Sequence, residues 1–185
     1  MSLFGNGLDA AVQKAFTRPA PKSAPAQMRY LVKQLKTTKA VAQMLRISQR
    51  TVERYVKDQI KKPRPDLAAR LENEVKKRWQ PQIRAKAREK AATTGGIVID
   101  TRARIGYTAP IGTTDEDRLR HLTIALPPRY AARLFAAQEQ GATDVELQQI
   151  AAEALKEVYF QDGGRRAGQL EEVRLTDIEH LEFDL

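Results

Sequence analysis

The 185-residue sequence contains no cysteine and only two histidines, His121 and His180. A chain without cysteine forms neither disulfides nor thiolate metal sites, and two histidines are too few for a histidine-rich metal cage. Serine is also scarce: all three serines precede residue 49, so the second half takes its hydroxyl groups from threonine and tyrosine alone. We therefore expect no thiolate or histidine-rich metal site, and no serine nucleophile in the second half.

Long apolar runs are missing as well. No stretch approaches the roughly 20 apolar residues of a membrane helix, and the N-terminus lacks the basic and apolar segments of a signal peptide. Apolar residues still make up 42% of the chain, which is enough to pack one medium domain or two small ones. We expect a soluble, cytosolic protein that does not contact a membrane.

Acidic residues are scarce in the first half only. Residues 1–92 contain 22 Lys and Arg against 7 Asp and Glu, whereas residues 93–185 contain 10 against 16. A basic half joined to an acidic half predicts a module that binds a polyanion beside a module with another role. The alternative is a basic surface that is merely solvated.

Prolines and glycines divide the chain into three segments. A short amphipathic stretch and a Pro-rich linker occupy 1–25, and a nearly continuous helical pattern occupies 26–92. Breaks in that pattern coincide with turn residues or prolines, at 36–38, 47–48, 63–65 and 81. The glycines at 95–96 open the third segment, 93–185, in which the period changes to the alternation of strands.

The third segment is predicted to hold a β-hairpin, two helices and a C-terminal strand. Residues 96–107 and 120–126 pair as the hairpin, with 108–118 as a long connection, and Thr143 caps the second of the two helices. The alternating tail, 171–185, pairs either within the fold or with a partner's sheet. The fold class is therefore α+β, with an all-α N-terminal half followed by a smaller α+β domain.

Residues 38–58 fit a helix-turn-helix. The inner face of a first short helix, the turn and the inner face of a second helix are formed by Val41, Ala42, Leu45, Ile47, Val52 and Val56. Ser48 is placed to cap the second helix by accepting a hydrogen bond from a backbone N–H near Thr51. Further on, a stripe at four-residue intervals is formed by Leu67, Leu71, Val75 and Trp79, and we expect it to pack on the helix-turn-helix rather than form a free dimer seam.

The start of the second helix would present polar side chains to DNA, as a recognition helix does. Arg50 and Arg54 are suited to guanine and Gln49 to adenine. Other candidates are Thr51 and Tyr55, together with phosphate contacts from Lys57, Lys61, Lys62 and Arg64. The alternative is an ordinary helical bundle with a basic surface.

Two threonines, Thr113 and Thr114, precede three carboxylates at 115–117. A threonine hydroxyl is a weak nucleophile unless another group removes its proton. The sequence contains no metal triad, Ser–His pair, Walker loop or Rossmann fingerprint, and no visible partner makes His121 a base. The residues alone favour a turn or a helix N-cap over a reactive hydroxyl.

Several segments nevertheless carry a specific resemblance, namely M-S-L-F-G, the helix-turn-helix, T-G-G-I-V-I-D-T-R-A-R-I-G-Y-T-A-P-I-G-T-T-D, Y-F-Q-D-G-G-R-R-A-G and H-L-E-F-D-L. Over essentially its whole length, the chain resembles the telomere terminal proteins of Streptomyces-type linear chromosomes and plasmids. In that family a threonine hydroxyl replaces the 3′-OH of a primer and accepts the first deoxynucleotide during end patching, which links the protein covalently to the 5′ end. The matching residue is Thr114.

The resemblance implies a protein primer and not an enzyme. Its partners would be telomeric DNA, a telomere-associated protein that recruits it and a DNA polymerase that supplies Mg²⁺ and catalyses the transfer. The chain would have no cofactor of its own and would lie in the nucleoid at the ends of linear DNA. The long connection expected at 108–118 suits a hydroxyl that must enter a polymerase.

Two other functions compete with this one. A helix-turn-helix transcriptional regulator would need no covalent chemistry, and residues 122–135 also resemble a ribbon-helix-helix unit. An autonomous nucleotidyltransferase is disfavoured because no metal-binding constellation can be assembled. The oligomeric state is left open, a homo-oligomer included.

Overall fold

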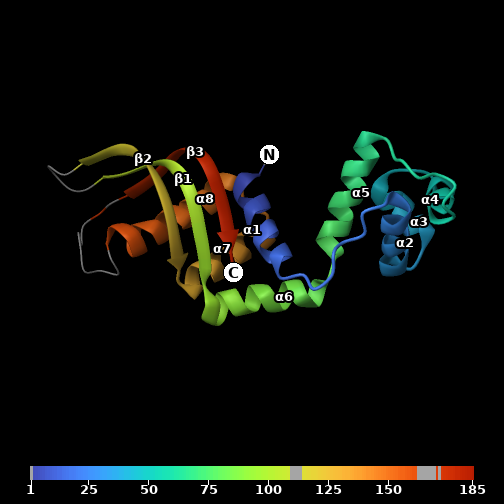
Figure 1. Ribbon diagram of the computed structural model, residues 1–185, viewed down its shortest axis with the longest axis horizontal. Coiled ribbons are helices and arrows are strands. Elements are labelled where there is room, and N and C mark those ends of the chain that lie inside the picture. Colours follow the sequence, from blue (N-terminus) through green and yellow to red (C-terminus); the bar gives the residue numbers. More distant parts are fainter. Residues whose placement is uncertain (1, 109–113, 162–169, 171) are drawn as a thin grey trace. The chain divides into compact units, whose positions relative to one another are not determined.

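The computed structural model describes residues 2–108, 114–161, 170 and 172–185 (Figure 1). These residues form two compact units: a sheet unit, which combines Met1–Phe16 with Gln82–Leu185, and a helical unit, Thr17–Pro81. The α+β class predicted from the sequence is confirmed. The units differ from the three expected segments, because the N-terminal helix packs in the sheet unit and the helical unit ends at Pro81.

The helical unit contains four helices, α2 (Ala24–Leu35), α3 (Thr38–Leu45), α4 (Gln49–Val56) and α5 (Pro65–Arg78). The breaks between them fall where turn residues and prolines predicted. Leu67, Leu71 and Val75 of α5 are buried in the core of the helical unit, where α5 packs mainly on α2 and also on α3. Trp79, the fourth residue of the expected stripe, follows α5 and is half-buried. Trp79 packs edge-on against Tyr30 and donates its indole N–H to the carbonyl of Arg18 at 3.0 Å.

The sheet unit is built on three antiparallel strands in the order β2-β1-β3: β1 (Ile97–Thr108), β2 (Thr114–Leu126) and β3 (Glu172–Asp184). The tail strand therefore pairs within the fold, along β1, and is an edge strand. The expected long connection at 108–118 is wrong, because β2 begins at Thr114 and pairs there with Thr108. The strand continues through polar residues before position 120, where no apolar side chains alternate. The apolar pattern therefore predicted only the second half of β2.

Helices cover one face of this sheet (Figure 1). The inward side chains of β1, among them Ile97, Ile99 and Ile105, are buried in a core with α1 (Leu3–Lys14), α7 (Pro128–Glu139) and α8 (Asp144–Leu155). A π-helical turn, Lys156–Phe160, extends α8, and α6 (Pro81–Lys90) leads through a second such turn, Ala91–Gly95, into β1. Gly96 joins this turn to β1 with a φ of +71°, a conformation that favours glycine.

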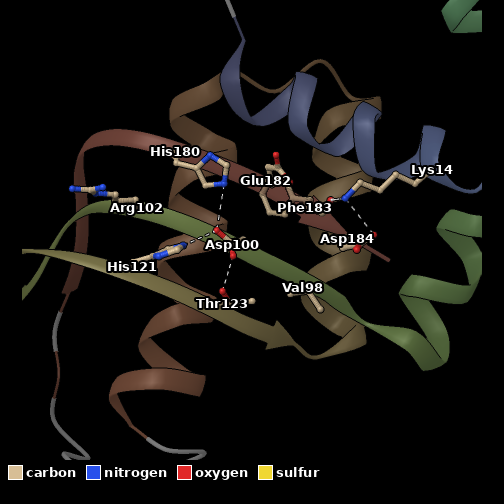
Figure 2. Close-up of a pocket in the computed structure, with 10 residues that line it drawn as sticks. All are labelled: Lys14, Val98, Asp100, Arg102, His121, Thr123, His180, Glu182, Phe183 and Asp184. Carbon is tan, nitrogen blue, oxygen red and sulfur yellow. Dashed lines mark hydrogen bonds and ion pairs between the residues drawn. The ribbon is translucent and has the colours of Figure 1, made fainter.

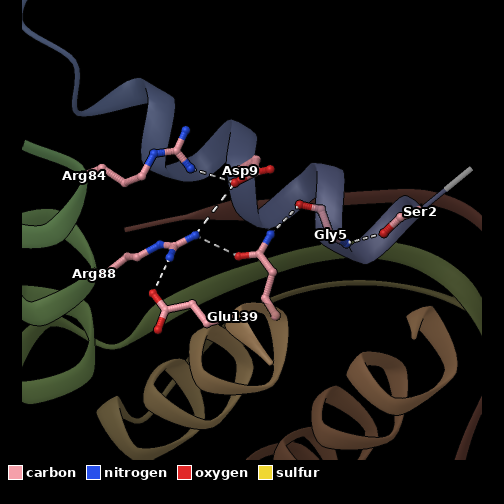
Figure 3. Close-up of polar contacts among 7 residues, drawn as sticks. Ser2, Gly5, Asp9, Arg84, Arg88 and Glu139 are labelled. Carbon is pink, nitrogen blue, oxygen red and sulfur yellow. Dashed lines mark hydrogen bonds and ion pairs between the residues drawn. The ribbon is translucent and has the colours of Figure 1, made fainter. Parts of the chain in front are cut away.

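Two sets of polar contacts hold α1 in the sheet unit. The carboxylate of Asp144, at the start of α8, accepts hydrogen bonds from the Ser2 hydroxyl and from the backbone N–H groups of Leu3, Phe4 and Gly5. On the next turn of α1, Asp9 pairs with Arg84 at 2.9 Å, and Arg88 bridges Asp9 to Glu139 (Figure 3). Because these partners are at least 70 residues from α1 in the chain, the sequence around α1 indicated a separate segment.

Candidate nucleic-acid interface and priming threonine

The helix-turn-helix has the geometry that its sequence predicts. Val41, Leu45 and Val52 are fully buried, and the Ser48 hydroxyl accepts a hydrogen bond from the backbone N–H of Thr51 at 3.1 Å. The turn between α3 and α4 passes through Arg46 in a left-handed conformation, with a φ of +55°. The cap and the buried face together leave the start of α4 exposed, where a DNA-binding helix-turn-helix would present its base-reading side chains.

Tyr55, which was expected to contact DNA, does not lie on the exposed surface of α4. Its side chain is only 3% exposed and lies in the core of the helical unit, where burial raises the pKa of its phenol. Val56, which was expected to face inward, is only half-buried. The inner face of α4 is thus centred on Val52 and Tyr55, one turn apart, so Tyr55 supports the helix from behind and is unavailable to DNA.

The expected base-reading arginines are exposed. Within the part of the chain that the structure describes, neither Arg50 nor Arg54 pairs with a carboxylate. The residues expected to contact phosphates follow α4 and are also exposed, namely Lys57, Lys61, Lys62 and Arg64. The helical unit contains 17 Lys and Arg against 5 Asp and Glu, a balance that suits a polyanion.

The two remaining candidates are partly occupied by contacts inside the protein. Thr51 is half-buried, and its hydroxyl lies 2.8 Å from that of Ser48. Gln49 is exposed, but its amide nitrogen donates to the Thr38 hydroxyl at 3.1 Å and to the Glu53 carboxylate at 2.9 Å. Sequence spacing did not predict this network, because Thr38 lies on the other helix.

Thr114 is the first residue of β2 and stands opposite Thr108 at one end of the hairpin. Its neighbour Thr113 lies outside the described residues. Close by, the register of β1 shifts at Gly106, where an added Cβ would lie 1.9 Å from Oδ1 of Asp117. That carboxylate oxygen lies 3.5 Å from Arg174 of β3, so the last of the three carboxylates after Thr114 contacts the sheet itself.

Both histidines meet one carboxylate on the open face of the sheet (Figure 2). Nε2 of His121 lies 3.1 Å, and Nε2 of His180 lies 3.3 Å, from Oδ1 of Asp100, while the Thr123 hydroxyl donates to Oδ2 at 2.6 Å. The bond from Thr123, followed by the contacts with the histidines, lowers the pKa of Asp100. His121 therefore has the acidic partner that its sequence neighbourhood did not reveal.

This cluster borders a hollow of about 530 Å³ but lies far from Thr114. Asp100 precedes Thr108, the partner of Thr114, by eight residues of extended strand, which span roughly 26 Å. Within one molecule, His121 is therefore too distant to take a proton from Thr114. Among the described residues, no group of three or more metal-ligating side chains is arranged to hold an ion.

Comparisons with protein-family models, with curated proteins and with solved structures found no match to this chain. Within the described ranges, no helix combines the length and apolar character that crossing a membrane requires.

Proposed function

We propose that this chain is a DNA-binding terminal protein whose Thr114 hydroxyl accepts the first deoxynucleotide at the 5′ end of linear DNA. The observation that carries the proposal is the helix-turn-helix: a capped α4, a buried inner face and outward-facing Arg50 and Arg54 in a strongly basic unit. The priming role of Thr114 comes from the family resemblance and is supported by its place at the end of the β1–β2 hairpin.

The proposed step is an ordinary nucleotidyl transfer. The Oγ1 oxygen of Thr114 attacks the α-phosphorus of a deoxynucleoside triphosphate, a phosphoester bond forms, pyrophosphate leaves, and the hydroxyl proton passes to a base. Because the Asp100–His121 pair lies roughly 26 Å along the strand, the base and the Mg²⁺ come from the partner polymerase. Thr114 acts as a substrate in this step, in place of a 3′-OH.

The two units would have different partners. The helical unit would hold telomeric DNA, whereas the sheet unit, with 15 Lys and Arg against 18 Asp and Glu, would meet the polymerase and a telomere-associated protein. A slightly acidic unit avoids competing for the same DNA phosphates. This arrangement would place the protein in the nucleoid, at the ends of linear DNA.

The test uses the full-length chain with its polymerase, telomeric DNA and one α-labelled deoxynucleotide. Label that stays with the protein after denaturation, disappears in Thr114→Val and remains in the matched control Thr113→Val supports the proposal. Undiminished labelling of Thr114→Val would remove Thr114 from the role. The site of any adduct is then read by peptide mapping.

The competing function is a transcriptional regulator without covalent chemistry, favoured by the same helix-turn-helix. A ribbon-helix-helix role for the sheet unit is harder to sustain, because β2 belongs to a three-stranded sheet and the unit contains more acidic than basic residues. The regulator would be favoured if the protein bound duplex DNA specifically but the complete polymerase reaction transferred no label to any of its residues.

A further inference from the structure

The hydrogen bonds at the start of α4 decide which groups Gln49 can offer to a base. Its amide nitrogen donates to the Thr38 hydroxyl, in the first turn of α3, and to the carboxylate of Glu53, one helical turn further along α4. A primary amide has two N–H hydrogens and one acceptor oxygen. Both hydrogens are therefore used inside the protein, and the oxygen alone is left for DNA.

The ionised carboxylate of Glu53 fixes the orientation of this amide. If the amide turned over, its oxygen would face the carboxylate, and two acceptors would then meet without a hydrogen between them. The bond to an ionised group is also the stronger kind of hydrogen bond. Glu53 thus holds the nitrogen of Gln49 inward, and Thr38 holds it from the opposite helix.

Glu53 itself needs an explanation, because a carboxylate beside a DNA-reading surface repels phosphates. It is the only acidic residue between positions 17 and 57. Arg50 lies one turn before Glu53 and Lys57, the C-cap of α4, lies one turn after it, yet within the described ranges Glu53 pairs with neither. Its bond to Gln49 gives the carboxylate a role that does not require a cation.

We propose that Gln49 reads DNA through its oxygen alone and selects a base that presents an amino group in the major groove, adenine or cytosine, with Glu53 as its positioning residue. Adenine N6 and cytosine N4 are the two amino donors in that groove. The usual two-bond contact of glutamine with adenine also needs an N–H for adenine N7, and here both are engaged. The inference rests on the proposed DNA binding and refines its specificity.

The experiment selects duplexes from a library randomised over the binding site, using the full-length chain and four variants. In the wild type, one position should accept A and C about equally and exceed G and T on the order of tenfold. Gln49→Ala should lose this preference. Glu53→Ala frees one N–H and should shift the preference toward A over C, on the order of tenfold.

Two matched controls separate orientation from charge and packing. Glu53→Gln removes the charge but retains an acceptor oxygen, so affinity should rise for all duplexes alike while A and C stay equivalent. Thr38→Ser retains the hydroxyl and should behave as the wild type. Circular dichroism checks that each variant remains helical.

Each other outcome has a distinct meaning. A wild type that prefers A over C on the order of tenfold at the Gln49-dependent position overturns the inference, as does an identical change in Glu53→Gln and Glu53→Ala. Binding that ignores Gln49→Ala overturns it as well but leaves DNA binding standing. A wild type that retains no duplex from the library contradicts the proposed function itself.

Discussion

Replacing Asp144 tests whether the N-terminal helix belongs to the sheet unit. Its carboxylate accepts bonds from the Ser2 hydroxyl, at 2.7 Å, and from three backbone N–H groups in the first turn of α1. Those N–H groups have no partner within the helix, and the dipole of α1 favours a negative charge at this end. Asp144→Ala removes all four bonds and the charge together.

The magnitude follows from these contacts. Loss of a capping side chain costs about 0.5–2 kcal/mol, and loss of a charge at a helix N-terminus costs about 0.3–1 kcal/mol. Because Asp144 is only partly buried, water replaces some of the lost bonds. We therefore expect the free energy of unfolding of the sheet unit to fall by about 1–2 kcal/mol. Asp144→Asn keeps one acceptor oxygen for the bonds that Oδ1 accepts, but it loses the charge and the bond from the Leu3 N–H to Oδ2, so its cost should be smaller than that of Asp144→Ala.

The effect should depend on pH. Burial raises the pKa of Asp144, but the hydrogen bonds from Ser2 and from the backbone of α1 outweigh it and hold the pKa below its usual value. A lowered pKa in the folded state gives stability that is complete above the unfolded value, about 3.9, and is lost as the pH falls through the folded value. The difference between wild type and Asp144→Ala should shrink over that acidic range.

The two units supply an internal control. Trp79 is the only tryptophan and lies in the helical unit, so its fluorescence during urea unfolding follows that unit alone. Hydrogen exchange of the α1 amides and the far-UV circular dichroism should report destabilisation, while the Trp79 transition stays in place. Unchanged exchange in α1 would refute the capping role of Asp144, and an equal shift of the Trp79 transition would contradict the expectation that the destabilisation is confined to the sheet unit.

Two further predictions concern DNA binding and the hairpin end. Arg54→Ala should weaken binding to the preferred duplex by about 1–3 kcal/mol and relax the sequence preference of the protein. Lys61→Ala should weaken binding to all duplexes alike and reduce the salt dependence of binding by about one phosphate contact. Fluorescence anisotropy at several salt concentrations separates the two variants, and identical behaviour would contradict base reading by Arg54. Gly106→Ala places a Cβ against Asp117 and should destabilise the sheet unit by about 1–3 kcal/mol in urea unfolding. Adding Asp117→Ala should restore part of this loss, and no recovery would contradict the steric cause.

Much of the candidate DNA interface could be predicted from the sequence, because its signals are local. A cap such as Ser48 acts within one helical turn, and Val41, Leu45 and Val52 lie close enough in the chain for helical spacing to place them. Tyr55 was misplaced because spacing alone allows a residue at the edge of the apolar face to point either way. Packing against the other helices turned it inward.

The rest depended on which strands pair and in what register. Asp100, His121 and His180 come from three strands, and only the pairing of Asp100 with Thr123 and of Arg102 with both histidines brings them together. Asp144 also has a role that its local sequence did not reveal. It begins α8, as the sequence predicted, but in the folded protein its carboxylate caps α1. By itself the sequence determined the local elements, the helix-turn-helix and the uneven charge, because these depend on neighbours within a few residues.

Only the tertiary structure decided that the tail completes the sheet and that the His–Asp cluster lies far from Thr114, because the register of the strands sets both. Only the tertiary structure decided where α1 packs, because the residues that hold it are distant in the chain.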